Sequence, residues 1–173
     1  MSDKNPLDIY EDILQGRVKL AQKESESDSA KILNSYLGML RTMYVVFQHG
    51  HWKCKCPAFY ANHLLFERIY KDVGDLVDET AEKIIGVFGN DALHHESQVE
   101  IISGLYKYQS NDHIENSIAA SKDFLKLAED VYNRIKEIGE MTLGLDDMIM
   151  SQASNVEKFI YLLTQAYPDQ RMD

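Results

Sequence analysis

The sequence predicts an all-α protein folded as one four-helix bundle, and three observations carry that prediction. The chain holds only nine Gly and three Pro among 173 residues, and so few helix breakers favour long, uninterrupted helices. Apolar residues recur at intervals of three and four along four long segments, as on one face of a helix. The length suits one domain with a real core and is too short for two.

The first two segments are predicted to be long helices joined by a short connection. Asp28 or Ser29 is expected to cap the first, and Pro57 is expected in the first turn of the second. The second helix should run over about 58–87 and close at Gly89. The apolar stripe of the first helix comprises Leu33, Leu37, Leu40, Tyr44 and Phe47 and continues into His51; that of the second comprises Phe59, Phe66, Tyr70, Val73, Val77 and Ile84.

Residues 90–112 form a connector that is too long for a tight turn. Its apolar residues, from Val99 to Leu105, predict a short helix inside it. Such a connector lets the chain cross the bundle, so the second and third helices need not be antiparallel neighbours. The third helix should start after Asp112 and stop near Gly139, and the fourth should end before Pro168.

These boundaries predict three regions. An N-terminal extension over 1–27 holds a possible short helix at 6–16, a bundle spans 28–168, and a short tail spans 169–173.

The net charge of −10 argues against general affinity for nucleic acid, which needs clustered Lys and Arg. The negative charge either keeps the protein soluble by mutual repulsion or gives it a surface that attracts cations. No apolar run is long enough to span a membrane, and the first residues lack a secretory pattern, so we expect a cytoplasmic protein.

A polar stripe on the second helix is the first candidate for chemistry. His63, Glu67, Asp78 and Glu82 are four, eleven and four residues apart, which places them within an arc of about 100°. The arc borders the apolar stripe, and a bound cation such as iron, manganese or zinc would relieve the repulsion among the carboxylates. The alternative is a solvated face, on which Lys71 pairs with Glu67.

His51 is the second candidate, because it continues an apolar stripe and precedes Trp52. A single His in such a place is either a metal ligand or a satisfied core residue. The chain has no Glu-x-x-His and no acid between Asp28 and Glu67, unlike bundles that hold two irons inside one subunit. The acids of the second helix therefore need a histidine from elsewhere.

Together these residues resemble a known family. The pair His51-Trp52, then Phe59, His63-x-x-x-Glu67 and Asp78-x-x-x-Glu82 is similar to the Dps proteins, or miniferritins, of the ferritin-like superfamily. The resemblance covers about residues 28–165. It implies a di-iron ferroxidase site at a two-fold interface, with His51 and His63 from one subunit and Asp78 and Glu82 from its partner. Family members usually have Asp where Glu67 stands.

The resemblance also implies a function. It predicts oxidation of Fe(II) by hydrogen peroxide or dioxygen at the di-iron site. It also predicts storage of Fe(III) in a hollow dodecamer built from two-fold dimers. Other divalent metals could occupy the same site. Trp52 is expected either to absorb a stray oxidising equivalent or to pack in the core. Asp146 and Asp147 match the region where the family lines its pores, although acids in a first helical turn are also explained by the helix dipole.

Two features leave rival interpretations open. Cys56 occupies the family's usual glycine position, and Cys54 and Cys56 lie too close together for a relaxed disulfide; they are reduced thiols, or they have a redox or soft-metal role. A nucleoid protein that compacts DNA is one alternative function, which the acidic charge disfavours. A metal-free four-helix interaction module is the other.

Overall fold

The computed structural model describes residues 27–55 and 57–166. The helix expected at 6–16 lies outside these ranges. The long helices are α2 (Asp28–Lys53), α3 (Phe59–Phe88), α5 (His113–Ile138) and α6 (Leu143–Ala166), and the connector contains η1 (Asn90–Ala92), α4 (Glu96–Ile102) and η2 (Ser103–Lys107). All regular elements of the described ranges are helical, as predicted. None of these helices combines the length and the apolar character that crossing a membrane requires.

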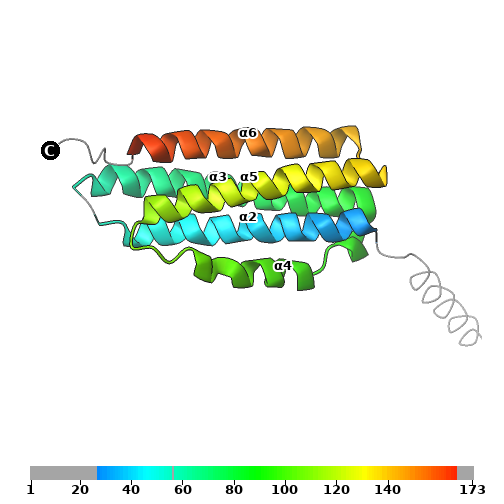
Figure 1. Cartoon of the computed structure of the whole chain (residues 1–173), viewed down its shortest axis with the longest axis horizontal. Coiled ribbons are helices and arrows are strands. Elements are labelled where there is room, and N and C mark those ends of the chain that lie inside the picture. The colour runs from blue at the N-terminus through cyan, green and yellow to red at the C-terminus, as the bar shows by residue number, and fades with distance from the viewer. Residues whose placement is uncertain (1–26, 56, 167–173) are drawn as a thin grey trace, which may run out of the picture.

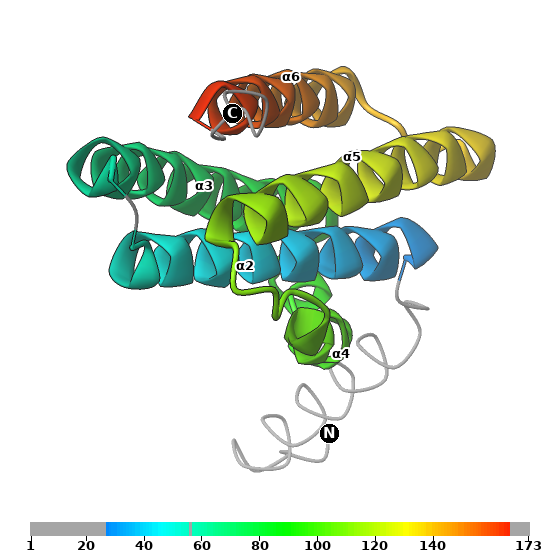
Figure 2. The same cartoon turned by 60° about the vertical axis from the view of Figure 1, so that its left-hand side comes forward.

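The four long helices form a bundle in which each helix has two close neighbours (Figure 1). Helix α2 packs against α3 and α5, and α6 packs mainly against α5 and less closely against α3. Helices α3 and α5 are therefore diagonal partners and run in the same direction, an arrangement that the long connector allows. Helix α4 lies on the outside of α2 (Figure 2), so the connector returns along the bundle instead of turning tightly.

The helix ends follow local chemistry, with two corrections to the predicted boundaries. Ser27, not Asp28 or Ser29, is the N-cap of α2, since its hydroxyl accepts from the Ala30 amide at 3.3 Å. A cap residue needs a non-helical backbone, which Ser27 has and Asp28, already in the first turn, does not. Pro57 lies in a turn before the N-cap Ala58, not inside the first turn of α3.

The other predicted boundaries are confirmed. The Asp112 carboxylate accepts from the amides of Ile114 and Glu115 at 2.9 and 3.1 Å, so it caps the start of α5. Gly139 ends α5 with a φ of +84°, a left-handed conformation that glycine adopts without strain. Helix α6 ends at Ala166.

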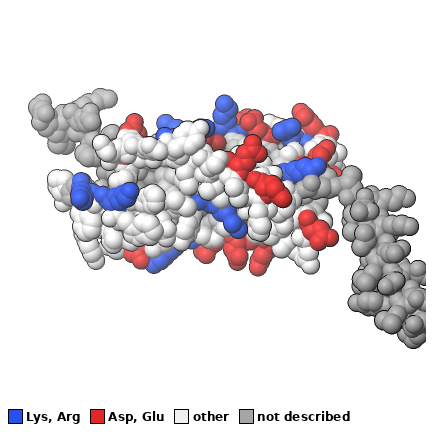
Figure 3. Space-filling model, turned by 90° about the horizontal axis from the view of Figure 1, so that it is seen from below, with Lys and Arg blue, Asp and Glu red and all other residues white. Residues whose placement is uncertain are grey.

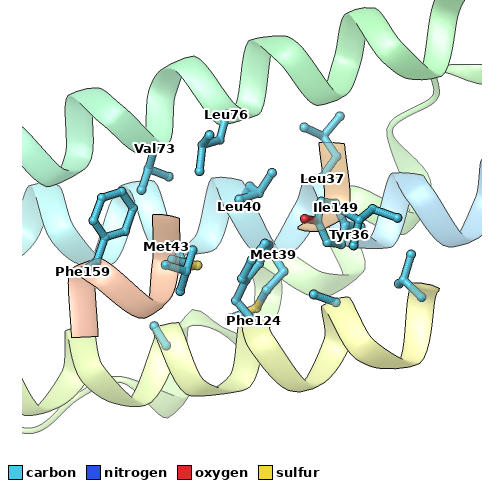
Figure 4. Close-up of a cluster of buried hydrophobic side chains, with 14 of the residues drawn as sticks. Tyr36, Leu37, Met39, Leu40, Met43, Val73, Leu76, Phe124, Ile149 and Phe159 are labelled. Carbon is cyan, nitrogen blue, oxygen red and sulfur yellow. The ribbon is translucent and has the colours of Figure 1, made fainter. Parts of the chain in front are cut away.

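Apolar side chains from all four long helices meet along the bundle axis (Figure 4). The Tyr36 and Phe124 rings lie 5.0 Å apart, and the Phe47 and Phe159 rings 6.4 Å apart, which joins α2 to α5 and to the diagonal helix α6. Burial of aromatic and aliphatic side chains along this axis is the main favourable contribution to folding of the bundle.

A polar network also lies inside the bundle. The Tyr36 hydroxyl donates to the Gln152 Oε1 at 3.0 Å, and the Gln152 Nε2 donates to the Glu79 carboxylate at 2.9 Å and to the Thr80 hydroxyl at 3.1 Å. Thr80 in turn donates to the Leu76 carbonyl at 2.7 Å. Tyr36, Thr80 and Gln152 thus each have a hydrogen-bond partner, as burial of polar groups requires.

Candidate functional site

Two imidazoles meet where α2 ends and α3 begins. His51 lies in the last turn of α2, and His63 lies one turn inside α3. The His51 Nδ1 donates to the His63 carbonyl at 3.0 Å, and the His63 Nδ1 donates to the His51 carbonyl at 2.9 Å. The two rings are stacked with centroids 3.8 Å apart and planes 22° from parallel. The pair is therefore held by two reciprocal hydrogen bonds and by its own ring contact.

This reciprocal arrangement fixes which ring nitrogen is available. A carbonyl oxygen can only accept a hydrogen bond, so each Nδ1 carries a proton. In the neutral imidazole the Nε2 then keeps its lone pair. A backbone carbonyl that holds one ring nitrogen is the usual support for a histidine that binds metal through the other. The local structure thus leaves two Nε2 lone pairs available to a ligand.

Aromatic neighbours hold the two rings on both sides. Phe59 stacks on His63 with centroids 5.3 Å apart, and Tyr70 presents an edge-on contact to His51 at 5.3 Å. Beneath the pair, an added Cβ on Gly50 would lie 2.6 Å from the Phe66 ring. Helices α2 and α3 approach closely at this point because residue 50 has no side chain.

Glu67 lies one turn after His63 and is paired with Lys71. The Lys71 Nζ donates to the Glu67 Oε1 at 2.5 Å, as the solvated-face interpretation allowed. This hydrogen bond and the Lys71 charge, with smaller contributions from His51 and His63, lower the pKa of the Glu67 carboxyl. The same pair raises the pKa of Lys71. Both partners are consequently charged at neutral pH.

Asp78 and Glu82 lie on the same helix but far from the imidazoles. Fifteen residues separate His63 from Asp78, which is about 22 Å along a helix axis. Both carboxylates are exposed, and neither has a hydrogen bond or an ion pair with the described part of the chain. One copy of the chain therefore presents the histidines and this carboxylate pair as two separate groups.

The structure also places the remaining predicted residues. Trp52 is 60% exposed, so packing in the core of its own subunit is wrong for this residue. Its ring is tilted against His49 at 5.8 Å. Asp146 is half-buried in the first turn of α6, and Asp147 is exposed beside it. Cys54 is buried, and its thiol lies 3.8 Å from the His51 carbonyl; Cys56 lies outside the described residues.

Sequence reasoning missed the aromatic neighbours of the histidine pair. Phe59 was assigned to an apolar stripe, yet it is 47% exposed and contacts His63. Tyr70 was assigned to the same stripe, yet it contacts His51 on another helix. The signal for Phe59 was its spacing of four residues from His63. No comparable signal exists for Tyr70, because spacing along one helix does not determine contacts with a second.

Within the described residues of one copy, no group of three or more His, Cys, Asp or Glu side chains is arranged to hold a metal ion. The metal site shared between two copies, which the resemblance implied, therefore stays a prediction.

Comparison with known proteins relates this geometry to other chains. No family profile matches the sequence. The chain is 26% identical to general stress protein 20U of Bacillus subtilis (strain 168) over 135 residues, covering 76% of this chain and 91% of that protein. It is 24% identical to a DNA protection during starvation protein of Brevibacillus brevis over 140 residues, covering 78% and 91%.

Solved structures agree with these sequence similarities. Mycobacterium smegmatis Dps matches with a TM-score of 0.69 and 18% identity, covering 84% of each chain. A Vibrio cholerae O1 Dps protein, described as a member of a broad superfamily of ferritin-like diiron-carboxylate proteins, matches with a TM-score of 0.64 and 22% identity, covering 79% of this chain and 87% of that one. In sequence this chain is similar to proteins of the Dps kind, and its four-helix bundle is the fold of the solved Dps structures.

Proposed function

We propose that this protein oxidises ferrous iron and stores the ferric product. Iron is bound at a site shared by two copies, through His51, His63 and Glu67 of one copy and through Asp78 and Glu82 of the other. The single observation that carries the proposal is the reciprocal pair of hydrogen bonds between His51 and His63. A core histidine needs only one such bond, whereas this pair leaves two Nε2 atoms for a ligand.

The donor set suits iron as a substrate. Imidazole nitrogen binds ferrous iron, and carboxylate oxygen, a hard anionic donor, stabilises the ferric state more strongly. The carboxylates therefore favour loss of the electron. With hydrogen peroxide as oxidant, two Fe(II) each give one electron, and two protons complete the conversion of one peroxide to two waters. Both electrons go to the same peroxide molecule, so no hydroxyl radical is released.

The requirement for a second copy follows from distance and charge. The Asp78 and Glu82 carboxylates have no hydrogen bond or ion pair with the described part of their own chain, and Asp78 lies about 22 Å along the helix from His63. Paired exposed carboxylates are favourable ligands once a cation neutralises them. A two-fold dimer would bring these carboxylates to the imidazoles of the other copy. The imidazoles of one copy and the carboxylates of the other would then form one site.

We further propose that twelve copies form a hollow shell that holds the ferric mineral. Such a shell would carry a charge of about −120, twelve times the −10 of one chain, which favours entry of cations. Asp146 and Asp147 are the candidate pore residues, and their acidic side chains at the start of α6 suit that role.

A complementation experiment tests the shared site. His51→Ala and Asp78→Ala should each abolish rapid ferrous oxidation under peroxide and under air, while the assembly keeps its size. When the two variants are co-refolded, half of the dimers pair unlike subunits, and each such dimer regains one intact site. The mixture should recover about one quarter of the wild-type rate. Co-refolding His51→Ala with His63→Ala is the control and should recover nothing. Recovery in the control, or none in the test, would overturn the shared site.

Compaction of DNA is the second candidate, since two relatives are named for DNA protection. On the face that carries α4, acidic and basic side chains are interspersed, without a continuous basic area over the described residues (Figure 3). With a net charge of −10, direct binding is unfavourable at physiological salt. Tight binding in a gel-shift experiment at 150 mM salt, on the order of physiological ionic strength, would support this candidate instead.

A further inference from the structure

An apolar groove on the outside of the bundle is a feature that the proposed function leaves unexplained. It lies where α2 packs between α3 and α4, and it encloses about 360 Å³. The residues around it are half-buried, so the groove is open to solvent in the described part of the chain. The groove is lined by Arg41, Tyr44, Val45, Gly74, Val77 and Ile102.

Arg41 carries the only charge among these lining residues. Its Nε is buried without a hydrogen-bond partner, and its guanidinium forms no ion pair within the described ranges. Leaving a buried donor of a charged group unpaired is unfavourable. The groove therefore fits a partner that has an apolar face with a carboxylate beside it.

The N-terminal extension, whose first 26 residues lie outside the described ranges, has helix signals in its sequence. Asn5 is a favourable N-cap, and Pro6 suits the first helical position that follows it. Gly16 is a typical residue just after the end of a helix. These three residues bound the short helix that we expect at 6–16.

The expected helix is amphipathic and acidic. Leu7, Tyr10 and Leu14 follow one another at intervals of three and four, which predicts one apolar stripe. Glu11 lies four residues after Leu7 and three before Leu14, so its carboxylate borders that stripe. Asp12 lies about 170° around the helix from the centre of the stripe. The segment thus combines an apolar face with one adjacent acid.

We propose that residues 6–16 dock in the groove of their own chain as an amphipathic helix, with the Glu11 carboxylate paired to Arg41. Arg41 lies about 20 Å along α2 from Asp28, where that helix begins. Residues 17–26 span up to about 33 Å when extended, so the segment reaches the groove. Because it is attached, its local concentration there is on the order of millimolar, which favours it over a free partner.

A docked segment leaves the residues of the proposed iron site accessible. The groove residues of α3 lie about 75° around its axis from the centre of Glu67, Asp78 and Glu82, on the side toward α2. His63 lies about 16 Å along the same axis from Gly74. The docking therefore does not rest on the proposed function, and each can fail without the other.

Hydrogen exchange of the full-length protein, followed by mass spectrometry, tests the docking. The amides of 6–16 should exchange more slowly in the wild type than in Leu14→Ser, which removes part of the apolar face. Glu11→Gln and Arg41→Gln should each speed this exchange about tenfold, the loss expected for one charge-assisted hydrogen bond. Reversing the pair, with Glu11→Arg and Arg41→Glu in one chain, should restore slow exchange.

Two matched controls make the same charge changes away from the contact. Asp12→Asn removes an acid from the opposite side of the expected helix, and Arg134→Gln removes an exposed arginine of α5. Neither should change the exchange of 6–16. Equal acceleration by either control would overturn the docking, as would wild-type exchange at the rate of an unstructured peptide.

A second copy of the chain is the other occupant that the groove could take. Light scattering of the same variants distinguishes the two. We expect Arg41→Gln to speed the exchange of 6–16 and to leave the molar mass of the particle unchanged. If Arg41→Gln instead lowers the molar mass while 6–16 exchanges as in the wild type, the groove belongs to a second copy and the proposal is wrong.

Discussion

The middle of the bundle and its histidine end differ in how fully their polar side chains are hydrogen-bonded. In the middle, Tyr36, Thr80 and Gln152 satisfy one another, and Gln152 also binds the Glu79 carboxylate. At the end of α2, His51 and His63 satisfy only half of their ring nitrogens. One network is closed and the other leaves lone pairs available.

The difference teaches where this bundle can bind metal. Ferritin-type bundles with an internal site line the core with Glu and His. Here that region is occupied by an amide and hydroxyls that are already hydrogen-bonded. The open donors lie at the periphery instead, on half-buried imidazoles and exposed carboxylates. In the function proposed above, a second copy of the chain completes the site.

The largest expected effect breaks the closed network. Gln152→Ala removes the partner of the buried Tyr36 hydroxyl and one partner of Thr80. We expect the free energy of unfolding to fall by about 2–4 kcal/mol, the cost of unsatisfied buried polar groups together with a small cavity. Urea denaturation measures this loss, and the affinity for Co²⁺, a redox-silent substitute for Fe(II), should not change. Ser151→Ala, on the exposed face of the same helix, is the control. A loss equal to that of the control would mean that the network contributes little.

The next largest effect should change both the stability of the bundle and metal binding at its histidine end. In Gly50→Ala the new Cβ would lie 2.6 Å from Phe66, so α2 and α3 must separate or the ring must move. We expect a loss of about 1–3 kcal/mol from overpacking, together with weaker Co²⁺ binding because His51 is the next residue. Gly86→Ala is the matched control, since its Cβ meets nothing within 4 Å; there Ala should stabilise the helix by about 0.5–1 kcal/mol. Unchanged metal affinity in Gly50→Ala would separate packing from the site.

A smaller effect on stability should accompany a large effect on binding at the open network. His63→Ala removes one exposed-side hydrogen bond, so we expect a stability loss of about 1 kcal/mol or less. The loss of a direct ligand should weaken Co²⁺ binding by at least about 100-fold, since removing an outer-shell partner alone costs 10–100-fold. His49→Ala, an exposed neighbour on α2, should change neither quantity. If His63→Ala is as unstable as Gln152→Ala, the imidazole is chiefly structural.

The smallest expected effect on stability comes from an exposed hydrogen bond that lies far from both regions. The Ser27 hydroxyl donates to the Glu140 carboxylate at 2.6 Å, and this bond, with contacts from Ser29, lowers the Glu140 pKa from its ordinary 4.5. A lowered folded-state pKa stabilises the protein fully above the unfolded value, and that stabilisation is lost as the pH falls through the folded value. Glu140→Gln should therefore cost less than about 1 kcal/mol at pH 7. Urea denaturation across pH 3–7, a range that brackets the carboxylate pKa, should show the difference from the wild type vanishing at the acid end. A difference that persists there would assign the effect to packing.

The fold was largely predictable because the position and the ends of a helix depend on residues that are close together in the sequence. The spacing of Leu33, Leu37 and Leu40 shows one buried face, and all three side chains are fully buried. Asp112 and Gly139 mark the ends of α5 through backbone chemistry that depends on nearby residues alone. One of the two corrected boundaries is the N-cap of α2, where Ser27 and the two predicted caps are adjacent residues of similar chemistry.

The candidate site was predictable in composition but not in arrangement. Spacing placed His63 and Glu67 on one face of α3, and the pairing of Glu67 with Lys71 was foreseen as an alternative. The stacking of His51 on His63 brings together two helices, and residue spacing along one helix does not determine how it meets another. The exposure of Trp52 depends likewise on how the end of α2 meets α3.

By itself the sequence determined that the chain is helical, where most helices begin and end, and which side chains are candidates to bind a cation, because these properties depend on spacing and on residue chemistry. Only the tertiary structure decided that His51 and His63 hold each other through their carbonyls, that Lys71 occupies Glu67, and that Gln152 closes the middle of the bundle. Those arrangements arise where separate helices meet, and the rotation of one helix against another is fixed by packing of the whole core.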